Sequence, residues 1–149
     1  MSTQNLSNKT LRGYISSRNI NGSFYPQNLQ NLLIRSFSTE NNINLQLSGT
    51  EWNIDNSYVM LRSIINKNND GLIFFSIFQI YDSRIPLSNF VNKLLLKKKL
   101  IVFCLENLVI TNKNDLKLVL DALKIYKINN SKNYKLNLNN LKKISKVLK

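Results

Sequence analysis

The stretch GLIFFSIF, residues 71–78, decides the fold class of this chain. It is a nearly continuous apolar run, and its length is that of a strand. Such runs are typical of strands that are buried on both faces, as the strands of a parallel sheet are. A second run of this kind is LIVFCLEN at residues 100–107, and two further strand candidates precede them, GYISS at 13–17 and INLQLSG at 43–49. We therefore expect four strands in one buried sheet.

Helical patterns separate and follow these strands. Their apolar residues recur at intervals of three and four, which places them on one face of a helix. Pro26 suits the first turn of one pattern, Thr111 can cap another, and lysines 97–99 favour a helix C-terminus. The four patterns cover residues 26–37, 58–65, 87–95 and 111–123.

The alternation of strands and helices predicts an α/β fold. Right-handed crossovers turn the order β-α-β-α-β-α-β-α into one parallel sheet with helices on both faces. We expect a single three-layer domain at residues 11–126, with its four strands in the order 2-1-3-4, after a flexible N-terminus at 1–10. For residues 127–149, the composition predicts a basic linker with a short amphipathic helix, or a tail that is partly disordered.

Composition excludes several classes of function. The chain has 149 residues and no histidine, which removes Ser-His-Asp triads and most zinc sites. Its one cysteine, Cys104, cannot form a disulfide within the chain and points to a reducing compartment. No apolar run approaches the roughly 18 residues of a membrane span, and the polar N-terminus lacks the apolar core of a signal peptide. We expect a cytoplasmic protein with no metal and no cofactor.

The net charge of +13 has two interpretations. Residues 124–149 hold eight lysines and no acidic residue, so most of the excess lies at the C-terminal end. A polyanionic partner, bound non-specifically as nucleic acid would be by this basic tail, is one explanation. The other is a general bias of the amino-acid composition toward Lys, Asn and Ile, together with a solvated tail. The composition favours this second interpretation.

Polar residues follow the predicted strands at their carboxyl ends, where parallel sheets bind ligands. We expect these ends to converge on one rim of the sheet. Each residue also has a plain structural interpretation, since serines cap turns and carboxylates lie in solvated loops. The candidates are Ser16, Ser17 and Arg18 at the end of the first strand, Ser48, Thr50 and Glu51 at the end of the second, Ser76 and Gln79 at the end of the third, and Glu106 at the end of the fourth.

Three of these residues are candidate catalytic groups. Ser17 could act as a nucleophile, but without histidine only Glu51 or Glu106 could serve as its base. Arg18 suits a carboxylate or a phosphate, and the helix that begins at Pro26 could add its N-terminus to an anion site. The chain lacks the glycine pattern of a nucleotide-binding loop. We expect Cys104 to be packed core.

The chain broadly resembles the catalytic domain of serine recombinases. The resemblance rests on Gly13, Ser17 and Gln27, on LSG at 47–49, and on the third-strand segment FFSIFQIYDSR at 74–84. It implies a resolvase-like fold, but the recombinase chemistry is missing. The recombinase serine aligns with Arg18, and the Asp-Arg pair expected after the third strand becomes Phe78 and Gln79. The arginine expected after SG has no counterpart, and such arginines hold the scissile phosphate.

A closer resemblance is to a small bacterial family, the sporadic carbohydrate cluster proteins. Its motifs lie between Leu11 and Tyr126 and largely coincide with the predicted rim. The resemblance implies a role in making or modifying a surface glycan and assigns no reaction. The motifs are RGYISSR at 12–18, PQNLQNLLIR at 26–35, LSGTEW at 47–52 followed by Tyr58, SIFQ at 76–79 and ENL at 106–108.

We therefore predict that the rim binds a sugar or a sugar phosphate. Arg18 and the helix at Pro26 would meet an anionic group, while Ser17, Ser48, Gln79 and Tyr58 would bind sugar hydroxyls. Gln27 is a further candidate ligand-binding residue. Two alternatives remain open: a degenerate recombinase-like domain that binds DNA, and a non-catalytic partner of a glycan enzyme. We also expect a homodimer through the fourth helix, whose apolar stripe extends past Leu123 to Ile125 and Tyr126.

Overall fold

The structure is a computed structural model that describes residues 5–54 and 57–147, with side chains up to residue 131. The chain divides into two compact units, Met1–Asp115 and Leu116–Lys149. The first holds all the strands, and the second belongs to one long helix. Each unit is described separately.

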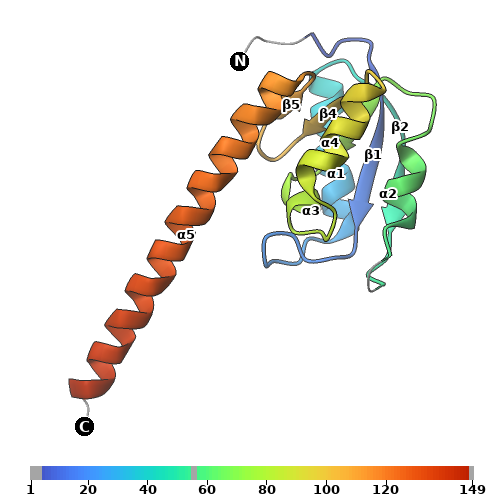
Figure 1. Cartoon of the computed structure of the whole chain (residues 1–149). Helices are drawn as coiled ribbons and strands as arrows, with labels where there is room; N and C mark the ends of the chain where they lie inside the picture. Colours follow the sequence, from blue (N-terminus) through green and yellow to red (C-terminus); the bar gives the residue numbers. More distant parts are fainter. Residues whose placement is uncertain (1–4, 55–56, 148–149) are drawn as a thin grey trace. The chain divides into compact units, whose positions relative to one another are not determined.

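The first unit is built on one five-stranded, mostly parallel sheet (Figure 1). The order of its four parallel strands is 2-1-3-4, as the sequence predicted. A bulge shifts the register between the first two strands at Arg12–Tyr14. In sheet order, the strands are β2 (Asn44–Glu51), β1 (Thr10–Ser16), β3 (Gly71–Phe74), β4 (Leu100–Phe103) and β5 (Leu108–Ile110).

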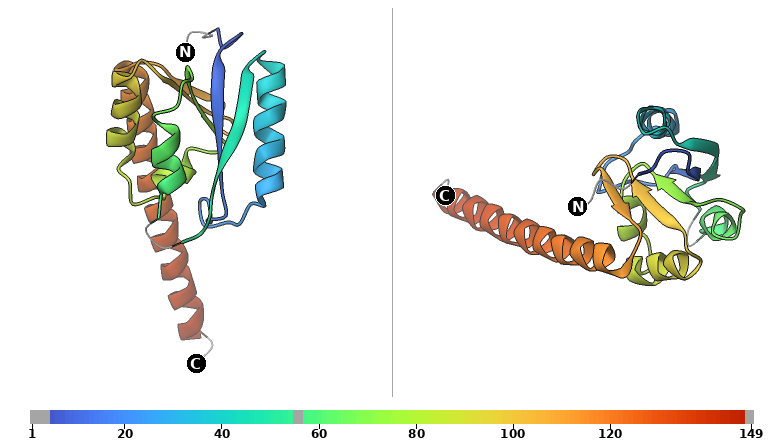
Figure 2. Two further views of the ribbon diagram at one scale, coloured as in Figure 1. Left: turned by 90° about the vertical axis from the view of Figure 1, so that its right-hand side faces the viewer. Right: turned by 90° about the horizontal axis from the view of Figure 1, so that it is seen from above.

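Helices cover both faces of this sheet. Helix α1 lies on one face, and α2 and α4 lie on the other (Figure 2). The three correspond to the first three helical patterns of the sequence. The helices of the described chain are α1 (Gln27–Glu40), α2 (Val59–Ile64), α3 (Phe78–Tyr81), α4 (Leu87–Leu96) and α5 (Lys113–Val147).

Alternate residues of the strands pack into two hydrophobic cores, one on each face of the sheet. Leu11 and Ile15 of β1 pack with Ile34 of α1 on one face. Tyr14 points to the other face, as the period of two along a strand requires. There Tyr14 and Phe74 lie with ring centroids 5.4 Å apart, and Phe90 of α4 meets Phe74 edge-on at 6.0 Å. Burial on both faces explains why β3 and β4 read as continuous apolar runs.

Two short elements were not predicted, and each shortens a predicted strand. The fourth run was expected to be strand as far as Asn107, but β4 ends at Phe103 and the chain turns back into β5, antiparallel to β4. Asn107, at φ 50°, supplies the left-handed residue of that turn. The third run was expected to extend through Gln79, but β3 ends at Phe74 and α3 begins at Phe78. The predicted four-stranded sheet is therefore corrected to five strands.

The ends of the chain also differ in detail from expectation. Residues 1–4 of the predicted flexible N-terminus lie outside the described residues, while Leu6 is buried and the Asn8 amide donates to Asn42 O at 2.8 Å. Helix α5 begins after Asn112, whose side chain accepts hydrogen bonds from the amides of Asn114 and Asp115. The cap is thus one residue after Thr111. The helix continues through residue 127, where the composition predicted a linker.

Candidate functional site

The carboxyl ends of β1 and β2 lie side by side. Ser16 is in register with Glu51, and the Ser17 amide donates to Glu51 O at 3.1 Å. Because adjacent parallel strands end at the same edge, the residues after them form one rim. Ser48 faces away from it, since its hydroxyl lies 3.3 Å from Asn31 Oδ1 of α1. Thr50 is half-buried within β2, opposite Ile15.

A buried amide network joins the ends of β1 and β3. Gln30 of α1 is fully buried, and its Oε1 accepts from the Ser16 amide at 3.0 Å and from Gln79 Nε2 at 3.1 Å. Its Nε2 donates to the carbonyls of Ser16 and Tyr25, both at 2.7 Å. Gln79 Oε1 accepts from the Ser76 amide at 3.2 Å. These residues hold the strand ends together, which is a structural task, and Gln30 was not among the site residues predicted from the sequence.

Both predicted acid–base residues serve as caps. Glu106 accepts from Ser76 Oγ at 2.6 Å and from the Ile77 amide at 3.1 Å, at the start of α3. Glu51 is 4% exposed and accepts from the Leu61 amide at 3.0 Å, in the first turn of α2. A carboxylate at such a position satisfies amides that a helix leaves without acceptors. Both carboxylates therefore have a structural role, which is to accept hydrogen bonds at the starts of α2 and α3.

Arg18 organises the loop after β2. Its guanidinium carbon lies 4.1 Å from the centroid of the Tyr58 ring, a cation–π arrangement. Its Nη2 donates to Ile54 O at 3.0 Å and to Ser57 O. Nearby, burial and then the negative charge of Glu51 raise the pKa of the Tyr14 hydroxyl, while Arg18 opposes that rise. Tyr14 is therefore neutral at physiological pH.

Three buried donor groups of the rim have no hydrogen-bond partner among the described residues. They are Ser17 Oγ, Arg18 Nη1 and Gln27 Nε2. Ser17 and Arg18 directly follow β1, and Gln27 is the first residue of α1, the next element along the chain. Buried polar groups are nearly always paired in native proteins, so each of these groups needs an explanation. Ser17 in particular has no base beside its hydroxyl and is not an activated nucleophile in this structure.

A small pocket opens on the rim. It has a volume of about 20 Å³, room for a single water molecule. It brings together four of the predicted residues, Ser16, Arg18, Tyr58 and Gln79. Its other lining residues were not among the site residues predicted from the sequence, and they come from the loop after β1, from α3 and from the residues after α3. These are Asn19, Phe78, Asp82 and Ser83.

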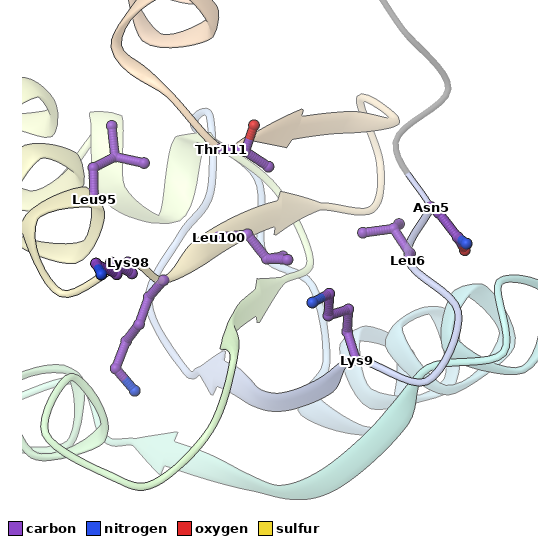
Figure 3. Close-up of a pocket in the computed structure, with 8 residues that line it drawn as sticks. Asn5, Leu6, Lys9, Leu95, Lys98, Leu100 and Thr111 are labelled. Atoms are coloured by element: carbon purple, nitrogen blue, oxygen red, sulfur yellow. The ribbon is translucent and has the colours of Figure 1, made fainter.

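A larger cavity of about 540 Å³ lies at the opposite, amino ends of β1 and β4 (Figure 3). Lys9 and Lys98 line it, and it holds none of the predicted site residues. Lys99 also borders it, but its ammonium group donates to Lys67 O at 2.7 Å and to Asn69 O and Oδ1. Burial and the neighbouring Lys97 lower the pKa of Lys99, and Asp70 partly opposes this.

Within residues 5–54 and 57–131, acidic and thiol side chains form no group of three that could hold a metal ion. Within the same ranges, none of the helices combines the length and the apolar character that crossing a lipid bilayer requires.

No family model matches this chain, and no curated protein or solved structure shows significant similarity to it. The geometry of the chain's own residues therefore carries the functional inference.

Proposed function

We propose that this protein binds a sugar or sugar-phosphate intermediate of surface-polysaccharide synthesis at the carboxyl ends of β1 and β2. The observation that carries the proposal is the set of unpaired donors, Ser17 Oγ, Arg18 Nη1 and Gln27 Nε2. All three are hydrogen-bond donors, and one belongs to a cation. Of the three residues, Arg18 lines the rim pocket, and a ligand with an anionic group and several hydroxyls would supply acceptors for donors of these kinds.

The size of the rim pocket limits how such a ligand binds. A volume of about 20 Å³ does not enclose a sugar ring. Only a small polar group enters, and the ring lies outside, against exposed side chains. Phe24 and Trp52 are 63% and 66% exposed, in the loops that follow β1 and β2. Aromatic rings of this kind offer an apolar face to the C–H groups of a sugar.

The same geometry favours binding over catalysis. Glu51 and Glu106 are engaged as caps, and the Ser17 hydroxyl has no partner to activate it. A role as a non-catalytic partner that presents a ligand to a glycan enzyme fits these contacts.

Thermal unfolding with a panel of ligands tests this proposal. The panel holds sugar phosphates, nucleotide sugars and acidic sugars, with uncharged sugars for comparison. A ligand at about one hundred times its Kd stabilises the fold by about 2.7 kcal/mol. Ser17→Ala removes an unpaired hydroxyl, so it should leave the unliganded protein as stable as before and weaken ligand binding about tenfold or more.

Ser36→Ala is the matched control, because Ser36 is exposed on α1 and its hydroxyl donates to Glu40 Oε1 of the same helix at 3.0 Å. It should bind the ligand as the unaltered chain does. The proposal fails if no member of the panel raises the melting temperature, or if the two serine variants respond alike.

The net charge of +13 supports a second candidate, non-specific binding of nucleic acid by the basic C-terminal residues. Such binding weakens steeply with salt, because it releases counterions from the phosphate backbone. Replacing Lys142, Lys143 and Lys146 by Gln should lower the salt dependence of duplex DNA binding. A covalent DNA adduct on Ser16 or Ser17 would instead support the recombinase alternative.

A further inference from the structure

A second cavity, of about 280 Å³, lies between α2 and α4 and shares no lining residue with the rim pocket. Its wall combines an apolar floor with polar and charged groups. Three segments supply it: Leu61, Arg62 and Ile65 from α2 and the residue after it, Arg84, Ile85 and Pro86 from the loop before α4, and Asn89, Phe90 and Lys93 from α4.

Positive charge dominates this cavity. Arg62, Arg84 and Lys93 are cationic, and none of the described residues lining it is acidic. Among the described residues, the side chains of these three make no ion pair and no hydrogen bond that the structure records. Three like charges around one cavity repel one another. An anion bound between them offsets this electrostatic repulsion.

The backbone adds to the positive electrostatic potential of the cavity. Helix α4 begins beside the cavity, with Pro86 at its N-cap position and no side-chain capping hydrogen bond. The first amides of a helix lack acceptors within the helix, and the N-terminus carries a partial positive charge. Asn89, in the first turn of α4, adds a side-chain amide at the cavity wall.

The volume of the cavity and its apolar base indicate which class of ligand it can bind. Leu61 and Phe90 are buried and give the cavity an apolar base. A volume of about 280 Å³ lies near the lower end of the range for small-molecule sites. A single carboxylate would leave most of the positive charge unbalanced, whereas a phosphate monoester carries a charge of about −1.5 to −2.

We propose that this cavity binds the phosphate group of a small organophosphate, with Arg62, Arg84 and Lys93 around the phosphate and the organic part against Leu61 and Phe90. The site is distinct from the rim, and the proposal does not depend on the function proposed there.

Isothermal titration calorimetry at constant ionic strength tests the proposal. The probes are inorganic phosphate, glucose 1-phosphate and uridine diphosphate, with glucose and acetate as uncharged and carboxylate controls. We expect the two organophosphates to bind more tightly than inorganic phosphate, and glucose and acetate not to bind. Arg84→Gln and Lys93→Gln should each weaken organophosphate binding at least tenfold.

Arg35→Gln is the matched control, since it removes the same charge from an exposed position on α1, on the other face of the sheet. It should bind organophosphates at this cavity as the unaltered chain does. Because Arg84 and Lys93 are exposed, their variants should unfold at the same urea midpoint as the unaltered chain, which confirms that the fold is intact.

Two results would overturn the proposal. One is no binding of either organophosphate at millimolar concentration, and the other is equal affinity in Arg84→Gln and Arg35→Gln.

Discussion

Glu106 illustrates how one residue type can suit two roles. A carboxylate at the end of a buried strand is the pattern of a catalytic acid, and it is also the pattern of a cap. Its two hydrogen bonds, to Ser76 Oγ and the Ile77 amide, cross about thirty residues of sequence. They fix the chain where β3 turns into α3. The geometry therefore assigns Glu106 to the fold.

Replacing Glu106 tests this assignment. Glu106→Ala should lower the free energy of unfolding by about 1.5–3 kcal/mol, the usual range for hydrogen bonds to a charged group. Glu106→Gln should cost less, because its side-chain oxygen can still accept one of the two bonds. Urea unfolding measures both, and Glu40→Ala, at the exposed end of α1, is the control. Equal stability of the Glu106→Ala and Glu40→Ala variants would contradict the capping role.

Cys104 should be unreactive in the folded protein. Burial, and after it the negative charge of Glu106, raise the pKa of its thiol to about 12 from an ordinary 9.0. The thiolate is the reactive form, so labelling by a disulfide reagent at pH 9 should be slow in the native state and fast in urea. Cys104 is the only cysteine, so the signal is unambiguous. Equal rates in the two states would show that the thiol is accessible.

The raised pKa of the Cys104 thiol also makes the stability of the protein depend on pH. A thiol whose pKa is raised by folding stabilises the native state fully below its unfolded pKa of about 9. That contribution is lost as the pH rises from there toward 12. Tyr14, whose pKa is also raised, adds to the loss at higher pH.

At the scale of elements, the close approach of β3 and β4 depends on a glycine. A Cβ added at Gly71 would lie 2.1 Å from the carbonyl oxygen of Leu100, which is backbone and cannot rotate away. A Cβ at Gly49 would meet the flexible side chain of Met60 at 2.7 Å. The two glycines therefore differ in how well their surroundings can adjust.

Gly71→Ala should accordingly destabilise the protein more than Gly49→Ala does. We expect a loss of about 1–3 kcal/mol for Gly71→Ala, the usual cost of overpacking, and a smaller loss for Gly49→Ala. Chemical unfolding of the two variants side by side measures the difference. If Gly49→Ala proved as costly as Gly71→Ala, the approach of β4 to β3 would not be the constraint.

At the scale of the whole molecule, α5 suggests association between chains. Leu118, Ile125 and Ile128 are more than half exposed, and the first two lie seven residues apart, on one stripe of the helix. Exposed apolar stripes of this kind are typical of helix pairing. The dimer expected from the sequence remains a prediction, and the stripe says which residues would carry it.

Light scattering of two variants tests the dimer. Ile125→Asp places a charge on the stripe and should shift the protein from dimer to monomer at micromolar concentration. Lys127→Asp, about 200° further round the helix, should leave the mass unchanged. A monomeric unaltered chain at high micromolar concentration would refute the prediction.

The sequence by itself determined the α/β class, the order of the four parallel strands and the ranges of three helices within a few residues. These follow from local patterns: the apolar runs of β3 and β4 and the helical spacing from Leu29 to Phe37 depend on residues close in the chain. It also led us to expect Ser16, Arg18, Tyr58 and Gln79 at one rim, and these four residues line one small pocket there.

Only the tertiary structure decided what those rim residues do. Glu51 and Glu106 became caps because the amides they bind lie on other elements, and Gln30 joined the network because α1 brings it against Ser16. The cavity between α2 and α4 has the same origin, since Arg62 and Lys93 are about thirty residues apart in the chain. Whether a polar side chain is paired or unpaired depends on partners distant in sequence, and no local pattern carries that information.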